Sequence, residues 1–131
     1  MPIEIDHLGI AVRSLEEGLQ FYQELLGMAV TQRETVATEQ VSVAMLPAGA
    51  GRIELLAATA EDSAIAKFIA KRGPGLHHIA LRVDELEATL ERLKEAGARL
   101  LNKPRRGAGG HLYAFVHPAS SGGVLLELIQ K

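Results

Sequence analysis

The sequence contains no cysteine and no tryptophan, and neither long apolar runs nor an excess of positive charge. Without cysteine there are no disulfides and no thiolate metal ligands, which fits a reducing compartment. No apolar run approaches the ~20 residues that span a membrane, and the N-terminus lacks the features of a signal peptide. Lysine and arginine number 14 against 16 acidic residues, unlike a nucleic-acid-binding protein. We therefore expect a cytoplasmic protein whose partners are neither membranes nor nucleic acids.

What the chain does contain is an internal repeat. When residues 7–24 (HLGIAVRSLEEGLQFYQE) are placed over residues 78–95 (HIALRVDELEATLERLKE), six positions are identical at a constant offset of 71 residues. The identical pairs are His7/His78, Val12/Val83, Leu15/Leu86, Glu16/Glu87, Leu19/Leu90 and Glu24/Glu95. Such self-similarity predicts two copies of one structural unit.

Each copy predicts a short strand followed by a helix. Ser14 and Asp84 precede the helices as N-caps, each with a glutamate three residues later, which is the spacing of a capping box. Leucines then recur at helical spacing in both segments. Gly27 and Gly97 stand where the helices would end in a left-handed turn.

Strand-like segments follow each helix, at 29–35, 41–46 and 52–57 in the first half and at 99–102, 112–116 and 124–129 in the second. Each half is therefore βαβββ, with a linking helix at 61–73 that Asp62 or Ser63 caps. A ~60-residue unit buries too little of its surface to be stable alone. We expect the modules, about 1–60 and 74–131, to form one α+β domain over 1–131. Its sheet would be a curved, partly open mixed β-barrel with the helices outside.

Two adjacent histidines begin one predicted strand, GLHHIALRV at 75–83. Because side chains alternate along a strand, His77 shares a face with three apolar residues, whereas His78 lies beside Ala80 and Arg82. The apolar face predicts core, so His77 is interpreted as a structural residue, and the other face is predicted to be roomy. The segment DHLGIAV repeats the pattern, with His7 beside small residues.

The last strand of each half carries one glutamate among aliphatic residues, Glu54 in RIELLA and Glu127 in VLLELIQ. Taken singly, such a histidine could be a core residue and such a glutamate a solvent-facing one. If a pseudo-twofold axis relates the halves, however, His7 faces His78 and Glu54 faces Glu127. Two imidazoles and two carboxylates suit one divalent ion per chain, Zn²⁺, Co²⁺, Ni²⁺ or Mn²⁺. Without a metal, two buried carboxylates would repel each other and take up protons.

This duplicated plan, with a histidine in each first strand and a glutamate in each last one, resembles the vicinal oxygen chelate superfamily of glyoxalases, bleomycin resistance proteins and dioxygenases. Within it, DHLGIAV, EDSAIAKFIAKRGPGLHHIALRVDELEA, GAGGHLYAFVHP and GGVLLEL resemble the methylmalonyl-CoA epimerase family. The resemblance implies a metal-dependent enzyme of propionate metabolism that interconverts (2R)- and (2S)-methylmalonyl-CoA. The α-proton would be removed through a metal-stabilised enolate. A homodimer is implied as well.

The resemblance also implies roles for particular residues. The family's metal ligands map onto His7, Glu54, His78 and Glu127, and Glu127 is one catalytic acid/base. Some members have glutamine in place of Glu54, and some have a second catalytic glutamate where this chain has Val43. Glu54 is then the symmetric candidate for the second acid/base, since related glyoxalase-type enzymes use both metal-bound glutamates.

The basic, glycine-rich stretch NKPRRGAGGH at 102–111 is the candidate substrate-binding segment. Backbone N–H groups around Gly109 and Gly110 would meet the acyl carboxylate, and Arg105 or Arg106 would meet a phosphate of CoA. Ser120 or Ser121, in the turn HPASSGG, is a candidate hydrogen-bonding partner of the acyl-CoA. The alternative is an ordinary solvated hairpin loop.

Two other functions are compatible with the same fold. A glyoxalase I, or lactoylglutathione lyase, acting on a glutathione hemithioacetal would use the same four ligands. A non-catalytic small-molecule binding module, as in drug-sequestration proteins of this fold, would need no metal and would have no reason to keep all four ligand residues.

Overall fold

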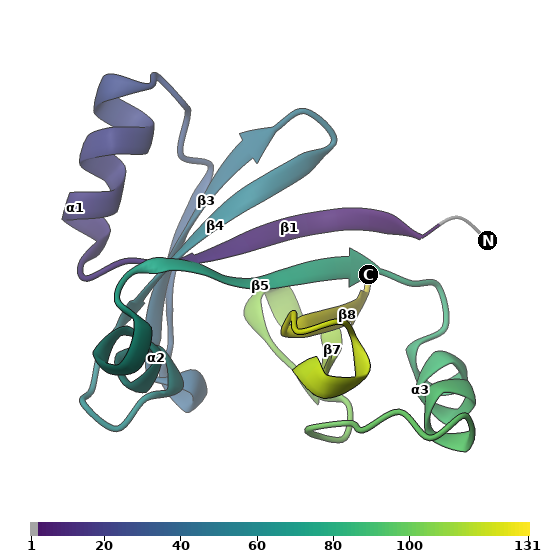
Figure 1. Ribbon diagram of the computed structural model, residues 1–131. Helices are drawn as coiled ribbons and strands as arrows, with labels where there is room; N and C mark the ends of the chain where they lie inside the picture. The colour runs from purple at the N-terminus through teal and green to yellow at the C-terminus, as the bar shows by residue number, and fades with distance from the viewer. Residues whose placement is uncertain (1–2) are drawn as a thin grey trace. The chain divides into compact units, whose positions relative to one another are not determined.

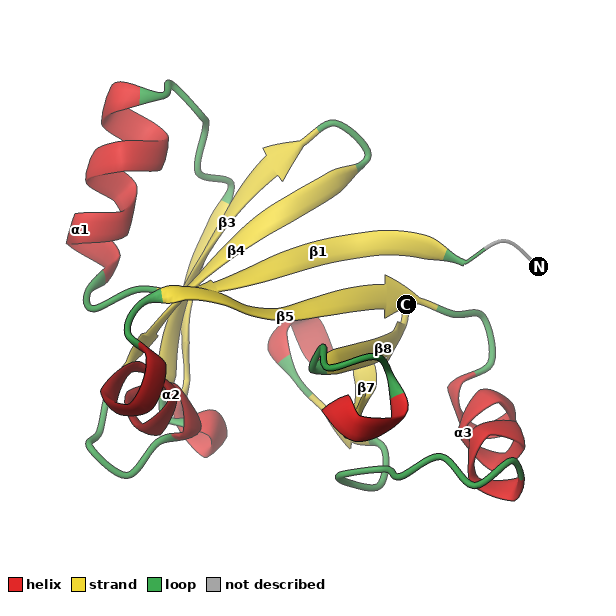
Figure 2. Cartoon of the chain, in the orientation of Figure 1, coloured by secondary structure: helices red, strands yellow, loops and turns green. Residues whose placement is uncertain are grey.

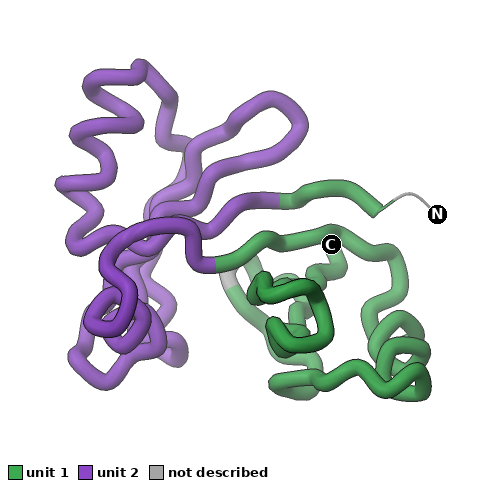
Figure 3. The backbone as a smooth tube through the Cα atoms, in the orientation of Figure 1, with its two compact units in different colours: residues 1–6, 78–131 green, residues 7–77 purple. Residues whose placement is uncertain are grey.

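The computed structural model describes residues 3–131, which form two compact units (Figure 3). One unit spans His7–His77, and the other combines the residues up to Asp6 with His78–Lys131. The chain therefore passes between the units twice, at the Asp6–His7 and the His77–His78 peptide bonds. Each crossing immediately precedes one of the predicted histidine ligands.

The unit of residues 7–77 is built on the first four strands (Figure 1). Its strands are ordered β2-β3-β4-β1, with β1 parallel to β4 and the other neighbours antiparallel. This is the βαβββ module predicted for the first half. In chain order the elements of the first half of the chain are β1 (Glu4–Ala11), α1 (Leu15–Leu19), the π-helix η1 (Gln20–Leu25), β2 (Gln32–Val36), the 3-10 helix η2 (Ala37–Glu39), β3 (Val41–Ala48), β4 (Gly51–Ala58) and α2 (Ala64–Arg72).

The second unit repeats this arrangement. Its strand order is β5-β8-β7-β6, and again the first strand runs parallel to the last. The second βαβββ module is therefore confirmed. Its elements are β5 (Gly75–Arg82), α3 (Leu86–Glu95), β6 (Arg105–Arg106), the 3-10 helix η3 (Ala108–Gly110), β7 (Leu112–Val116), the 3-10 helix η4 (Pro118–Ser120) and β8 (Leu126–Gln130).

Each unit has a helix, α1 or α3, drawn in red in Figure 2. This helix packs against strand residues that lie on the sheet face turned away from the predicted glutamate ligand. In the first unit, Leu15 and Leu19 of α1 pack with Leu55, the residue after Glu54. Gly18 allows this close approach, because a Cβ there would lie 2.9 Å from Leu55 Cδ1. In the second unit, the α3 core consists of Leu86 and Leu90 packed with Ala114, Val116 and Leu128.

The opposite face of the first sheet, which carries Glu54, is covered in part by α2. Ile65 of this helix is buried against Val43 and Leu56, together with Ala11 and Val41. The helix expected at 61–73 is observed as α2 with the shorter bounds Ala64–Arg72. Ser63 is its N-cap, since the Ser63 hydroxyl accepts a hydrogen bond from the Ala66 N–H at 3.1 Å.

The strand predicted at 99–102 is wrong. Only Leu100 forms an isolated bridge, with Val116, and the edge strand is β6 at Arg105–Arg106. The reason is local: the side-chain oxygen of Asn102 accepts the hydrogen bond of the Phe115 N–H at 2.9 Å, so a side chain takes the place of a backbone carbonyl there.

The predicted helix ends are confirmed except for one cap. Ser14 Oγ accepts a hydrogen bond from the Glu17 N–H at 3.1 Å, and Gly27 and Gly97 have φ angles of +87° and +90°. Asp84 is not the N-cap of α3, because the cap position is Glu85, whose side chain makes no capping hydrogen bond.

A distant side chain satisfies the start of α3 instead. The Leu86 N–H donates a hydrogen bond to Gln130 Oε1 at 2.7 Å, from the end of β8.

In the described part of the chain no helix is both long enough and apolar enough to cross a membrane.

Candidate functional site

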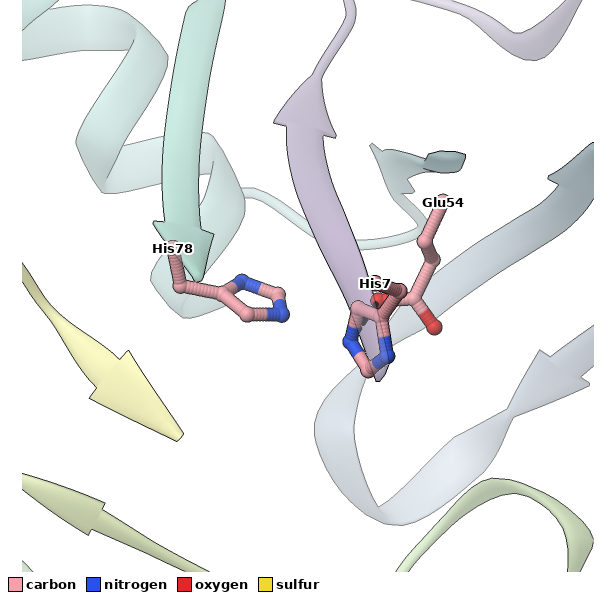
Figure 4. A group of neighbouring side chains, drawn as sticks. All are labelled: His7, Glu54 and His78. Carbon is pink, nitrogen blue, oxygen red and sulfur yellow. Dashed lines mark ion pairs between the residues drawn. The ribbon is translucent and has the colours of Figure 1, made fainter. Parts of the chain in front are cut away.

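The first candidate pair of metal ligands lies on adjacent parallel strands, His7 on β1 and Glu54 on β4 (Figure 4). Gly9 is the register partner of Glu54, so His7, two residues earlier, projects from the same sheet face as Glu54. His7 Nε2 lies 3.4 Å from Glu54 Oε1. Both residues are buried, at 3% and 6% exposure.

The second pair has the same construction in the other unit. His78 on β5 is two residues before Ala80, whose register partner on β8 is Glu127. His78 Nε2 lies 3.1 Å from Glu127 Oε1, and both residues are again buried. The duplicated sequence thus produces a duplicated His–Glu pair, of which Figure 4 draws the histidine.

The distances within each pair fit two ligands of one ion. Ligand atoms about 2.1 Å from an ion are about 3.0 Å apart at a right angle and about 3.4 Å apart at the tetrahedral angle. The measured separations of 3.1 and 3.4 Å fall within this range. An N–H···O hydrogen bond would account for the shorter one as well. In both pairs, an imidazole nitrogen and a carboxylate oxygen face each other, the donor types that borderline divalent metals take.

Burial singles out the same four residues. The buried polar or charged residues of the described chain are Asp6, His7, Glu54, Ser63, His78 and Glu127. Ser63 is accounted for as a helix cap, and Asp6 forms ion pairs with Lys131 and Arg82. Burying a carboxylate costs free energy unless it is paired. The two His–Glu pairs are therefore the buried polar groups for which a bound cation would supply the compensating charge.

The surroundings of the two glutamates differ. Glu54 on β4 pairs with Met45 on the neighbouring strand β3. Val43, two residues before Met45, lies on the same sheet face, pairs with Leu56 and is only 2% exposed. The position where some family members carry a glutamate is thus apolar in this chain. At Glu127 the corresponding neighbour is Phe115, and the ring of His78 meets the Phe115 ring edge-on at 5.7 Å.

His77 is half-buried, and its ring meets the Phe68 ring of α2 edge-on at 4.9 Å. This contact agrees with the structural role interpreted from the sequence. The predicted contrast between the two faces of β5 is weaker than expected: His78 and Ala80 are buried, whereas Ile79 on the apolar face is half-buried.

The predicted substrate-binding residues are exposed and lie on β6, η3 and η4, where their polar groups already make internal contacts. Arg106 Nη1 donates a hydrogen bond to the Gly110 carbonyl at 2.8 Å, and the Gly110 N–H donates to the Gly107 carbonyl at 2.9 Å. Gly109 has a φ of +71°, in the left-handed region. Ser120 Oγ accepts a hydrogen bond from the Arg99 N–H at 2.8 Å. The Gly110 N–H therefore already donates within the segment. The Ser120 hydroxyl acts as an acceptor here, so its own proton can be donated to a ligand.

Sequence reasoning missed Asp6. It is 1% exposed, and one of its carboxylate oxygens lies 2.9 Å from Lys131 Nζ and 3.6 Å from Arg82 Nε. Its place directly before His7 in DHLGIAV was the available signal, but nothing in the local pattern shows that its partners are a strand end and the last residue of the sequence.

Comparison with known proteins identifies the class. Residues 6–115 match the model of the Glyoxalase/Bleomycin resistance protein/Dioxygenase superfamily. The chain therefore belongs to this superfamily, and the fold class predicted from the duplicated modules is confirmed.

Within the superfamily the similarity is to methylmalonyl-CoA epimerases. The chain is 38% identical over 129 residues to the ethylmalonyl-CoA/methylmalonyl-CoA epimerase of Cereibacter sphaeroides, covering 96% of both chains. It is also 39% identical over 127 residues to an uncharacterised Bacillus subtilis protein, YqjC, covering 96% of this chain and 91% of that one.

Two solved structures extend the similarity to three dimensions. The methylmalonyl-CoA epimerase of Mycobacterium tuberculosis is 40% identical, with a TM-score of 0.90 over 97% of this chain and 87% of that one. A variant of the Streptomyces coelicolor enzyme, in complex with 2-nitronate-propionyl-CoA, is 38% identical, with a TM-score of 0.92 over 98% of this chain and 94% of that one.

Proposed function

We propose that the protein is a divalent-metal-dependent methylmalonyl-CoA epimerase. The observation that carries the proposal is the duplicated, buried His–Glu pair, with its donor atoms 3.4 and 3.1 Å apart. It stands in a chain similar over nearly its full length to proteins named for this activity. An acyl-CoA thioester is then the substrate.

The metal site in this proposal consists of His7, Glu54, His78 and Glu127 around one ion per chain, Co²⁺, Zn²⁺, Ni²⁺ or Mn²⁺. Two neutral imidazoles and two carboxylates give a neutral site with a divalent cation and leave positions for further ligands. When bound, the cation supplies positive charge beside the thioester and carboxylate oxygens of the substrate, which is worth several kcal/mol as negative charge develops there.

Glu127 and Glu54 are the acid/base residues in this proposal. Epimerisation requires removal of the proton from the carbon between thioester and carboxylate, and delivery of a proton to the opposite face of that carbon. One carboxylate takes the proton while the other, in its protonated form, donates one. Val43 has no ionisable group, so a second base at that position is excluded, and Glu54, on the same sheet face, is its replacement.

The exposed segments β6, η3 and η4 of the second unit contribute to acyl-CoA binding. Arg106 offers a cation for a CoA phosphate, although it must leave the Gly110 carbonyl or share it. Gly109 and Gly110 keep the loop backbone accessible, and the Ser120 hydroxyl donates a hydrogen bond to the acyl group. The homodimer and the cytoplasmic location expected from the sequence stay predictions.

The proposal is tested by assaying chelator-treated protein with (2R)-methylmalonyl-CoA, then repeating the assay after adding each of Co²⁺, Zn²⁺, Ni²⁺ and Mn²⁺. We expect no epimerisation without metal and activity with at least one of them. The same preparations are assayed with methylglyoxal and glutathione. Turnover of that hemithioacetal alone would indicate a glyoxalase I, and a chain that takes up none of the metals would be a binding module.

A further inference from the structure

A buried ionic cluster lies in the unit formed by residues up to Asp6 and 78–131. The Asp6 carboxylate is 2.9 Å from Lys131 Nζ and 3.6 Å from Arg82 Nε. The Asp6 side chain is 1% exposed, whereas those of Lys131 and Arg82 are 23% and 39% exposed. One buried negative charge is thus held between two partly exposed positive charges.

Each residue of this cluster lies on, or directly after, a strand that carries a proposed metal ligand. Arg82 follows His78 by four residues within β5, so it projects from the same side of that strand, and Lys131 lies just beyond the end of β8, four residues after Glu127. Asp6 differs, since it directly precedes its ligand. Strand by strand, the pairs are Asp6 with His7 on β1, Arg82 with His78 on β5, and Lys131 with Glu127 at β8.

Asp6 does not belong to the donor set itself. Adjacent residues of a strand project to opposite sides, so the Asp6 and His7 side chains point away from each other across β1. The carboxylate of Asp6 is instead engaged by the two cations. Any effect of Asp6 on His7 therefore passes through the backbone that the two residues share, at one of the two places where the chain changes units.

The residue before the other ligand histidine is anchored as well. By the repeat offset of 71 residues, Asp6 corresponds to His77, which directly precedes His78. The His77 ring packs edge-on against Phe68, and Asp6 is held by ion pairs. Each ligand histidine thus follows a residue whose side chain is fixed to the unit that the chain is leaving.

We propose that Asp6 is a positioning residue for metal binding, an inference that rests on the proposed function. Its ion pairs with Lys131 and Arg82 hold the beginning of β1 to β5 and β8, and so fix the backbone from which His7 presents Nε2. Replacing the carboxylate by an amide keeps the shape but removes the charge, and leaves two cations without their counter-ion.

The test is calorimetric titration of chelator-treated protein with Co²⁺, comparing wild type, Asp6→Asn and Leu90→Ala. Loss of groups that orient metal ligands costs about 10–100-fold in metal affinity, and we expect Asp6→Asn to raise the Kd for Co²⁺ by this factor. Leu90→Ala removes a core side chain under α3 and serves as the control for a general loss of stability. Its Kd should stay within about twofold of wild type.

At saturating Co²⁺ the kcat of Asp6→Asn should return to within about threefold of wild type, because a positioning residue changes occupancy rather than chemistry. If Asp6→Asn does not fold, Lys131→Met removes one partner from a partly exposed position and should raise the Kd by at least about threefold. The inference is overturned if the Kd for Co²⁺ is unchanged in folded Asp6→Asn or in folded Lys131→Met. It is also overturned if Leu90→Ala raises this Kd by the same factor. A wild type that binds no Co²⁺ overturns the proposed function and this inference with it.

Discussion

In the unit of residues 7–77, Glu54 lies across from Met45 on the neighbouring strand, with Val43 next along the same face. In the other unit, Glu127 lies across from Phe115, with Tyr113 at the position that corresponds to Val43. Strand order, parallel pairing and the His–Glu pair are the same in both units. The two units therefore share the His–Glu pair, whereas the residues beside it differ.

The helices increase this difference. The face of the first sheet that carries Glu54 is packed against Ile65 of α2 and is aliphatic. In the second unit, Arg82 at the end of β5 and Lys131 just after β8 are ion-paired with Asp6.

The largest effect is expected from breaking either half of the donor set. His7→Ala and His78→Ala should each lower epimerase activity by roughly 10³-fold at limiting metal, since several kcal/mol of charge stabilisation is lost. Steady-state assays with measured metal content check this. His77→Ala is the matched control, because it removes the ring contact with Phe68 but no ligand. A loss in only one of the two ligand variants would mean that one pair alone binds the ion.

The two glutamates are distinguished by isotope exchange. Glu54→Gln and Glu127→Gln keep an oxygen donor but remove a base, and each should lower epimerisation by at least about 10²-fold. The remaining carboxylate still removes the proton from its own side. We therefore expect each variant to exchange the α-proton of one epimer with solvent deuterium, and the two variants to differ in which epimer. Wild-type exchange of both epimers by Glu127→Gln would refute its role as acid/base.

A glutamate can be reintroduced at Val43, the position where some family members have one. In the Glu54→Gln background, Val43→Glu places a carboxylate on the same face of the sheet, where some family members have one, and should restore activity at least about 10-fold. Val43→Gln in that background adds a side chain of similar size without a base and should restore nothing. Because Val43 is 2% exposed, Val43→Glu alone should lower the free energy of unfolding. Equal activity of the Glu and Gln double variants would contradict the assignment of Glu54.

The smallest effects are expected from removing the side chains that accept hydrogen bonds at the N-termini of α1 and α3. Ser14→Ala removes the N-cap of α1, and Gln130→Ala removes the acceptor of the Leu86 N–H at α3. Each should lower the free energy of unfolding by about 1 kcal/mol in urea titrations. Asp84→Ala, at the cap position predicted from the sequence, should change it by less than about 0.5 kcal/mol. A larger effect at Asp84 than at Gln130 would reverse this assignment.

The sequence predicted the modules because their signals are local. Ser14, the leucines of α1 and Gly27 lie within one stretch of chain, and the 71-residue offset repeats the pattern. The glutamates were predicted for the same reason, as single acidic residues in apolar strands.

What could not be predicted depends on contacts distant in sequence. Gln130 caps a helix that begins 44 residues earlier, and Asn102 replaces a backbone acceptor for Phe115. Asp6 was missed because its burial depends on Lys131, at the far end of the chain. Hydrophobic periodicity is evaluated over short stretches of sequence, so it carries no information about partners this far apart.

The central claim is that the two His–Glu pairs hold a single ion, and the most direct test is the number of ions bound per chain. Chelator-treated protein is titrated with Co²⁺ in a calorimeter, with His7→Ala and His78→Ala titrated in parallel. We predict one ion per chain and a weakened Kd in both variants. Two ions per chain, with each variant losing one of them, would contradict the claim.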